Sequence, residues 1–199
     1  MKKFELTNEF VTNMFGTKLF RIRALVEFGD VEAGELGGYV EKESNLGHDD
    51  NAWVYDNAWV YGNAWVHGDA QVSGNARVYD NARVYGNALV CGNALVYGNA
   101  RVYGNARVCG DARVCGNGDY AYAHGFGSVN RTTTFFRLKD GGVGVRCGCF
   151  YGTLAQFRDK IRETHGETKK AQEYLMLADL MELRFEEDEN EVGNRKYVE

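Results

Sequence analysis

The sequence predicts a mainly β protein built around a parallel β-helix, with an N-terminal β cap and a C-terminal unit of one β-hairpin and two helices (ββαα). The first observation is a fixed period, because residues 51–116 are eleven uninterrupted hexads with the approximate consensus [ND]-A-x-V-[YC]-[GD]. Such a period is typical of repeat architectures. The second is the spacing of the apolar residues, which is two and four, whereas a helix needs three and four. The third is the Gly or Asp that ends each hexad, because turn-formers recur at one phase.

Each hexad predicts a short strand and a corner. Ala and Val are two residues apart and point to one side, while the x residue and the Tyr or Cys position point to the other. Val is β-branched and Ala is small, so we expect them to line a narrow core. Gly, Asp and Asn tolerate left-handed backbone angles at the corner. Asn side chains in register can also form a ladder from coil to coil.

Three hexads per coil would give a triangular cross-section with 18 residues per turn, and eleven hexads then make about 3.7 coils. At a strand spacing of about 4.8 Å the repeat is about 18 Å long. The outer positions then form three stacks: Tyr55, Ser73, Cys91 and Cys109; Tyr61, Tyr79, Tyr97 and Cys115; His67, Tyr85 and Tyr103. The first coil also places Trp53, Trp59 and Trp65 outward, one on each face. Since this is a large exposed apolar area, we expect the N-terminal segment or another subunit to cover it.

Residues 1–36 are expected to form the N-terminal cap and residues 37–130 the β-helix. Strands are predicted at 4–7 and 18–26, and they would close the coil end, which otherwise exposes unpaired backbone. An imperfect coil begins near Gly37, and a step of eight residues from Leu46 to Val54 predicts a bulge at 48–50. After the repeat, Tyr120 and Phe126 keep the six-residue spacing, with larger side chains inside.

Residues 131–185 are expected to form the hairpin and the two helices. Residues 132–138 and 143–151 are the predicted strands, joined by a turn at 139–142. Thr153 is expected to cap the first helix, which ends near Gly166, and the second runs from about Thr168 to Phe185. Residues 186–199 are an acidic tail that we expect to be disordered.

The hexads resemble the left-handed parallel β-helix of the hexapeptide-repeat proteins, many of which are acyltransferases. Their motif has an aliphatic residue followed four positions later by a small one, as in Val54 and Ala58. The lead-in FGDVEAGELGGYV at 28–40 resembles that of a bacterial and phage group of such proteins that carry a transferase name. With RTTTFFR at 131–137 and CGCFYG at 147–152, nearly the whole chain resembles small proteins of phages and mobile elements. The resemblance implies a left-handed helix and a host bacterial cytosol.

Composition excludes several classes of function. The net charge of −5 gives no general attraction to nucleic acid or membrane. We see no signal peptide and no membrane-length apolar run. The five cysteines are an odd number, which argues against a closed disulfide framework, so we expect a cytoplasmic protein with reduced thiols. Cys91 and Cys109 would be stacked neighbours, consistent with a thiol pair in one ladder, and no cysteine set has the spacing of a metal site.

An acyltransferase of this fold would use a histidine as general base beside coenzyme A, usually at a subunit boundary. The candidates are His67, on the repeat surface within a tyrosine stack, and His124, at the exit of the repeat. His48, beside two aspartates, and His165, at a helix end, fit structural roles better. No long loop interrupts the hexads to cover a substrate, and we see no lysine-rich patch for the phosphates of coenzyme A. These absences argue against catalysis, although a site at a trimer interface stays open.

A binding function rests on outward arginines among aromatic residues. Guanidinium groups among tyrosine rings can hold a phosphate or a nucleobase, but they can equally be ordinary solvated side chains. The hairpin adds positive charge and hydroxyl donors. The predicted ligand-binding residues are Arg83, Tyr85, Arg101, Tyr103, Arg131, Thr132, Thr133, Thr134 and Arg137.

From these observations we expect a non-catalytic binding protein that forms a homo-oligomer, a dimer or a trimer. The resemblance to phage proteins implies a host-directed, anti-defence inhibitor, which either sequesters a small anionic nucleotide or covers a host protein. The first alternative is an acyltransferase that depends on acyl-coenzyme A. The second is a structural or assembly protein that uses its Tyr and Trp surface. No cofactor is expected except coenzyme A under the first alternative.

Overall fold

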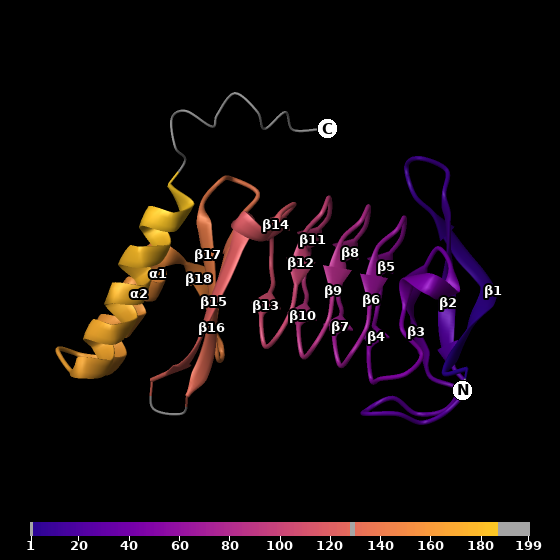
Figure 1. Ribbon diagram of the computed structural model, residues 1–199, viewed down its shortest axis with the longest axis horizontal. Coiled ribbons are helices and arrows are strands. Elements are labelled where there is room, and N and C mark those ends of the chain that lie inside the picture. The colour runs from indigo at the N-terminus through magenta and orange to yellow at the C-terminus, as the bar shows by residue number, and fades with distance from the viewer. Residues whose placement is uncertain (1, 128–129, 187–199) are drawn as a thin grey trace.

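The fold is a parallel β-solenoid closed at both ends by other structure. The computed structural model describes residues 2–127 and 130–186, so the predicted tail 186–199 lies, except for Glu186, outside the described residues. N-terminal strands cover one end of the solenoid, and a sheet backed by helices covers the other (Figure 1). The predicted fold class is therefore confirmed.

The repeat forms two-residue strands in three parallel sheets, as the 18-residue coil predicts. Each strand pairs with the one 18 residues later, so that Val66 lies on Val84 and Val84 on Val102. The Ala and Val of every hexad are at most 1% exposed, which confirms them as the core. The strands are β4 (Trp53–Val54), β5 (Trp59–Val60), β6 (Trp65–Val66), β7 (Gln71–Val72), β8 (Arg77–Val78), β9 (Arg83–Val84), β10 (Leu89–Val90), β11 (Leu95–Val96), β12 (Arg101–Val102), β13 (Arg107–Val108) and β14 (Arg113–Val114).

The corners use the expected chemistry. The Asn51 amide donates to the Asp69 carboxylate at 2.8 Å, and Asn75 donates to the Asn93 carbonyl at 3.3 Å, so the predicted ladder is present. Where aspartate replaces the last glycine of a hexad, it adopts the same left-handed backbone. Asp80 has φ +57° and its carboxylate accepts from the Gly98 N–H at 3.2 Å. The side-chain bond compensates for a backbone angle that glycine adopts at lower cost.

The N-terminal cap consists of β1 (Phe4–Thr12), β2 (Lys18–Ala24) and β3 (Leu36–Val40). β1 and β2 are antiparallel, and β3 lies parallel to β5 as the first rung of one solenoid face. A short 3₁₀ helix, η1 (Glu43–Asn45), follows, and Leu46 bridges to Val66 as the first rung of another face. Val40 and Leu46 therefore begin the imperfect coil that their spacing predicts.

The three tryptophans of the first coil differ in how far they are buried. Trp53 is fully buried, with its ring edge-on to Phe4 and Phe28 of the N-terminal segment. Trp59 is half-buried beneath the guanidinium of Arg77 at 4.4 Å. Trp65 stays 40% exposed. The expectation that the N-terminal segment covers the outward tryptophans is thus confirmed for Trp53, whereas Trp65 stays partly exposed.

The solenoid ends in a sheet with the strand order β15-β16-β17-β18, preceded by the 3₁₀ helix η2 (Asn117–Asp119). The strands are β15 (Tyr120–Phe126), β16 (Arg131–Arg137), β17 (Val143–Cys147) and β18 (Phe150–Thr153). This differs from the expected hairpin in two ways. Residues 120–126 pair antiparallel with β16 and do not continue the coil, and the return strand is split by a tight turn in which Gly148 has φ +58°.

The two faces of this antiparallel sheet pack against different parts of the protein. Phe136 of β16 joins the solenoid core, while Phe135 packs on the helices. The helices are α1 (Leu154–His165), capped by the side chain of Thr153 as predicted, and α2 (Lys169–Phe185), capped by the side chain of Thr168. Their apolar residues, including Phe157 and Tyr174, form a second hydrophobic core with the sheet.

Cys91 and Cys109 form a disulfide. The expectation of reduced thiols is therefore wrong for this pair. The same 18-residue register that stacks the two positions brings their Cα atoms to 4.6 Å, which lies within the range that a disulfide spans. Cys115, Cys147 and Cys149 are not in disulfides.

Candidate ligand-binding face

One face of the solenoid gathers four of the nine predicted binding residues. It is the sheet of β6, β9 and β12, whose outward positions carry Trp65, His67, Arg83, Tyr85, Arg101 and Tyr103, here called the aromatic–arginine face. The x residue and the Tyr position of a hexad are two apart, so both point away from the core. The parallel register then places the arginines in one row and the rings in another.

The rings form a continuous stack along the solenoid. The ring centroids of His67 and Tyr85 are 5.0 Å apart, and those of Tyr85 and Tyr103 are 5.3 Å apart. Tyr122 of β15 then meets Tyr103 edge-on at 6.3 Å. The stack therefore runs from the first coil to the terminal sheet.

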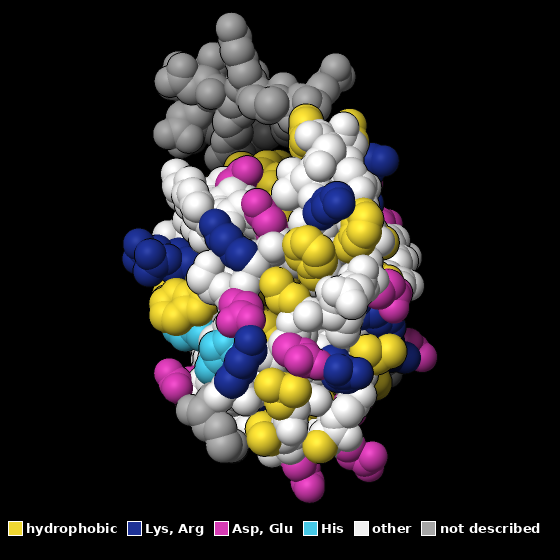
Figure 2. All heavy atoms as spheres, turned by 90° about the vertical axis from the view of Figure 1, so that its right-hand side faces the viewer, with side chains coloured by type: hydrophobic (Ala, Val, Ile, Leu, Met, Phe, Trp, Pro, Cys, Tyr) yellow, Lys and Arg dark blue, Asp and Glu magenta, His cyan; other side chains and the backbone are white. Residues whose placement is uncertain are grey.

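Trp65 covers the free end of this stack. Gly47 occupies the rung before His67, and its N–H donates to the Val66 carbonyl at 2.8 Å, but glycine has no side chain to cover the imidazole. The indole of Trp65 lies there instead, with its centroid 3.8 Å from that of His67. In the view onto the cap end, histidine side chains gather at one edge beside a large hydrophobic group (Figure 2). Trp65 thus offers a partly exposed aromatic surface at the start of the row.

The arginine row has no internal counter-charge. Arg83 and Arg101 are direct register partners and both are exposed. In residues 2–127 and 130–186, neither guanidinium forms an ion pair with a carboxylate. By contrast, Arg77 lies over Trp59, and Arg113 donates to the Ala112 and Asn93 carbonyls. The face thus presents two neighbouring positive charges beside flat rings.

Burial keeps the histidine of this face neutral. Burial is the main cause that lowers the pKa of His67 below its ordinary value of 6.5, and Arg83 lowers it further, while Asp50 opposes them. At pH 7 the imidazole is therefore uncharged. Its role in the stack is that of an aromatic ring.

The predicted residues of β16 do not lie on this face. Thr133 and Thr134 are fully buried, because β16 is covered by the solenoid on one side and by the helices on the other. The Thr134 hydroxyl accepts from the Arg107 N–H at 2.9 Å, and the Thr133 hydroxyl donates to Cys147 Sγ at 3.2 Å. The sequence predicts a ligand between the hairpin and the coils, but these two hydroxyls are enclosed there and bond to other protein groups.

The two arginines of β16 lie far from each other. Arg137 lies six steps along the extended strand from Arg131, which corresponds to about 20 Å. Arg131 is exposed beside Gly148, whereas Arg137 is mostly enclosed between the Phe185 ring at 5.5 Å and the Asp119 carboxylate at 4.0 Å. They form no common site.

The second histidine candidate, His124, lies on β15. Its Nδ1 is 2.8 Å from the Thr132 hydroxyl, and the residue is exposed. This places His124 at the far end of the solenoid from His67, and the described hydrogen bonds give its ring no titratable partner. No group of three His, Cys, Asp or Glu residues in the described part of the chain has the geometry of a metal site.

Two residues of this site were not singled out from the sequence. The sequence indicates Trp65 only as an outward tryptophan, and it gives no indication of Tyr122. One feature of the sequence does point to Trp65: Gly47 occupies the position before His67 in the ring stack and has no side chain to cover it. Tyr122 could not be found, because its strand was expected to continue the coil.

The repeat region is similar to a known family of repeats. The YdcK β-solenoid repeat matches the chain in overlapping windows that together cover residues 52–68 and 70–110. The repeat region is a β-solenoid repeat. The finer likeness to transferases of the hexapeptide class stays a prediction. A comparison with curated proteins finds no match. In the described residues, no helix has both the length and the apolar character needed to cross a membrane.

Proposed function

We propose that the chain is a non-catalytic binding protein that holds a small anionic nucleotide on the aromatic–arginine face. The observation that carries this proposal is the pair of exposed guanidinium groups of Arg83 and Arg101, which no described carboxylate pairs, beside a stacked row of rings. Arginine binds phosphate through charge-assisted hydrogen bonds, and aromatic rings accept bases by stacking. A nucleotide offers both groups at once.

The proposed arrangement assigns a part to each residue. The two guanidiniums lie on successive rungs about 4.8 Å apart and bind the phosphates. Trp65 and Tyr103, which are 40% and 42% exposed, are the rings that a base can contact. Following the resemblance to phage proteins, we propose that the biological role is to sequester a nucleotide signal of the host.

A second candidate is an acyltransferase with His67 as general base. The observation in its favour is that His67 is neutral at pH 7, as a base must be, and lies on an accessible face. Against it, both ring faces of His67 are occupied, by Trp65 and by Tyr85. An enzyme would lose turnover of acyl-coenzyme A in His67→Ala while keeping its fold.

The deciding experiment is isothermal titration calorimetry with a panel of nucleoside di- and triphosphates and cyclic dinucleotides. We expect one class to bind, and Arg83→Gln and Arg101→Gln each to weaken that binding about 10- to 100-fold, since each charge-assisted bond contributes about 1.5–3 kcal/mol. Arg107→Gln is the matched single-charge control for Arg83→Gln, because Arg107 holds the equivalent hexad position on another face. Equal losses in Arg83→Gln and Arg107→Gln, or no binding to any compound, would refute the proposal.

A further inference from the structure

The disulfide lies on a different face of the solenoid, the sheet of β4, β7, β10 and β13. Cys91 and Cys109 are the outward residues that follow β10 and β13, and the bond closes one coil of 18 residues. The backbone already fixes the spacing of these rungs, because the Cys91 N–H donates to the Val108 carbonyl at 2.9 Å. The sulfur–sulfur bond is therefore not needed to hold the two residues together.

The terminal sheet places an arginine beside this disulfide. Thr134 and Arg146 are direct cross-strand partners on β16 and β17, and Arg146 pairs in turn with Tyr151 of β18. Cross-strand partners point to the same face of a sheet. Both neighbours contact the last coil, because the Thr134 hydroxyl accepts from the Arg107 N–H and the Tyr151 hydroxyl accepts from the Asp111 N–H at 3.4 Å. Arg146 consequently faces the coil segment that contains Cys109.

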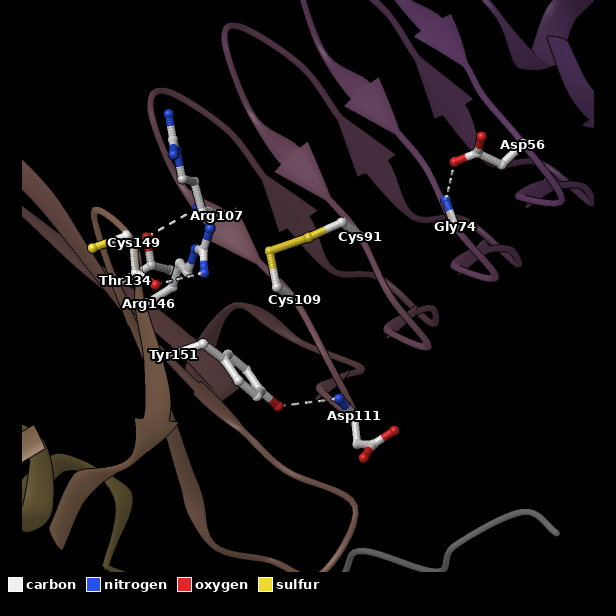
Figure 3. The surroundings of a disulfide bond; sticks show 10 residues. All are labelled: Asp56, Gly74, Cys91, Arg107, Cys109, Asp111, Thr134, Arg146, Cys149 and Tyr151. Carbon is white, nitrogen blue, oxygen red and sulfur yellow. Dashed lines mark hydrogen bonds between the residues drawn. A yellow bond between two sulfur atoms is a disulfide. The ribbon is translucent and has the colours of Figure 1, made fainter. Parts of the chain in front are cut away.

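The side-chain view agrees with this register. Arg146 extends from β17 toward the disulfide, whereas the Arg107 side chain points away from it (Figure 3). One guanidinium nitrogen of Arg146 donates to the Cys149 carbonyl at 3.4 Å. Its Nε is enclosed and has no hydrogen-bond partner among the described residues. An unused donor of a positive group thus lies at the Cys109 end of the disulfide.

The two sulfurs differ in access. Cys109 is only 5% exposed, while Cys91 is half-buried. An external thiolate therefore reaches Cys91 Sγ more easily. The departing sulfur is then that of Cys109, on the side where Arg146 lies, and a neighbouring guanidinium stabilises a thiolate and makes it a better leaving group.

We infer that Cys91–Cys109 is a thiol–disulfide exchange site for a small cellular thiol, with Cys91 as the attacked sulfur and Arg146 as the positioning residue for the Cys109 thiolate. In the first step the small thiolate bonds to Cys91 Sγ, the protein disulfide breaks, and the electron pair leaves on Cys109 Sγ. In the second step another small thiolate attacks the sulfur of the first small thiol in the mixed disulfide, and the Cys91 thiolate leaves. Two small thiols are oxidised to their disulfide, and their two protons go to the protein thiolates.

The reaction leaves the solenoid intact. The backbone hydrogen bonds between β10 and β13 do not involve sulfur, so the oxidised and the reduced protein share one backbone. The site is then a reversible two-electron couple on a rigid face. A disulfide that merely braces the fold would exchange slowly, and its rate would not depend on the charge of Arg146.

The test is reduction of the full-length protein by glutathione, followed by alkylation and peptide mass spectrometry at successive times. We expect the mixed disulfide on Cys91, and about 10-fold slower opening in Arg146→Gln with recovery in Arg146→Lys. Arg107→Gln, which removes the same charge from a side chain that points away, should open at the wild-type rate. Circular dichroism of each variant checks that the solenoid is folded.

Two outcomes would overturn the inference. One is a mixed disulfide that forms chiefly on Cys109. The other is the same opening rate in Arg146→Gln, Arg107→Gln and the wild type. Cys109→Ser provides an independent check, because its free Cys91 should accept glutathione from oxidised glutathione, and absence of that adduct would also contradict the assigned accessibility.

Discussion

At the residue scale, the repeat depends on single backbone angles at its corners. Gly86 has φ +67°, and a Cβ placed on it would lie 3.1 Å from the backbone nitrogen of Gly104 on the next coil. Any larger residue there must both adopt a left-handed conformation and push the neighbouring coil away. Asp56 and Asp80 show the alternative solution, in which a carboxylate bonds the next coil.

We therefore expect Gly86→Ala to lower the free energy of unfolding by about 1–3 kcal/mol, from the left-handed angle and the close backbone contact. Gly118→Ala is the control, because a Cβ on Gly118 meets nothing within 4 Å and its φ is not left-handed. Urea denaturation followed by circular dichroism measures both. An unchanged midpoint in Gly86→Ala would show that the corners tolerate a side chain.

At the element scale, the outer tyrosines act as ladders and not as separate side chains. The rings of Tyr61, Tyr79 and Tyr97 stack with centroids 5.1 and 5.2 Å apart. Burial is the main cause that raises the pKa of each of these phenols above 10. The folded protein therefore favours the neutral phenols more strongly than the unfolded chain does.

The sign of the pH dependence follows from these raised pKa values. The stabilisation is complete below the unfolded pKa of about 10 and is lost as the pH rises toward the folded pKa. We expect the melting temperature to be insensitive to tyrosine ionisation between pH 7 and 9 and to fall above about pH 10. Tyr79→Phe keeps the ring and removes one titrating group, so its alkaline loss should be shallower while its stability at pH 7 stays close to that of the wild type. An identical alkaline fall in both proteins would contradict this assignment.

The repeat strands and β16 differ in how much of their structure the sequence predicts. The interior Ala and Val, the three stacks and the 18-residue register follow from period and spacing alone, because the side chain at each position repeats. β16 could not be predicted in the same way. Its Thr and Phe residues do not alternate along the strand, so the sequence does not show that both faces are buried. That burial depends on the solenoid and the helices that pack against β16. This is why Thr133 and Thr134 were expected to bind a ligand although they are enclosed.

At the scale of the whole molecule, two unrelated structures close one solenoid. The C-terminal sheet brings its own second hydrophobic core with α1 and α2. The N-terminal cap has no such core and shares that of the solenoid, with Phe4 and Trp53 in the same cluster. The cap therefore depends on its contacts with the first coil.

Lys3 is the polar centre of those contacts. Its ammonium donates to the Asp50 carbonyl at 2.6 Å and to the Ala52 carbonyl at 2.9 Å, and it lies over the Phe28 ring. Burial lowers the pKa of Lys3 to about 8, against the opposing carboxylates of Asp50 and Asp49, so desolvation works against the ammonium. An apolar side chain at position 3 has no donor and could not form the hydrogen bonds that these two carbonyls accept from Lys3.

We expect Lys3→Met to loosen the cap and to lower the free energy of unfolding by about 2–4 kcal/mol, because the buried hydrogen bond to the Ala52 carbonyl and the partly buried one to the Asp50 carbonyl are both lost. The reporter is Trp53, which is fully buried under the cap, observed in a Trp59→Phe/Trp65→Phe background. Its fluorescence should move to longer wavelength at lower urea than the circular dichroism of the repeat. Lys2→Met is the control, since it removes only the exposed ion pair with Glu43, and exposed pairs contribute little. Coincident transitions at the wild-type midpoint in Lys3→Met would show that apolar packing alone holds the cap on the solenoid.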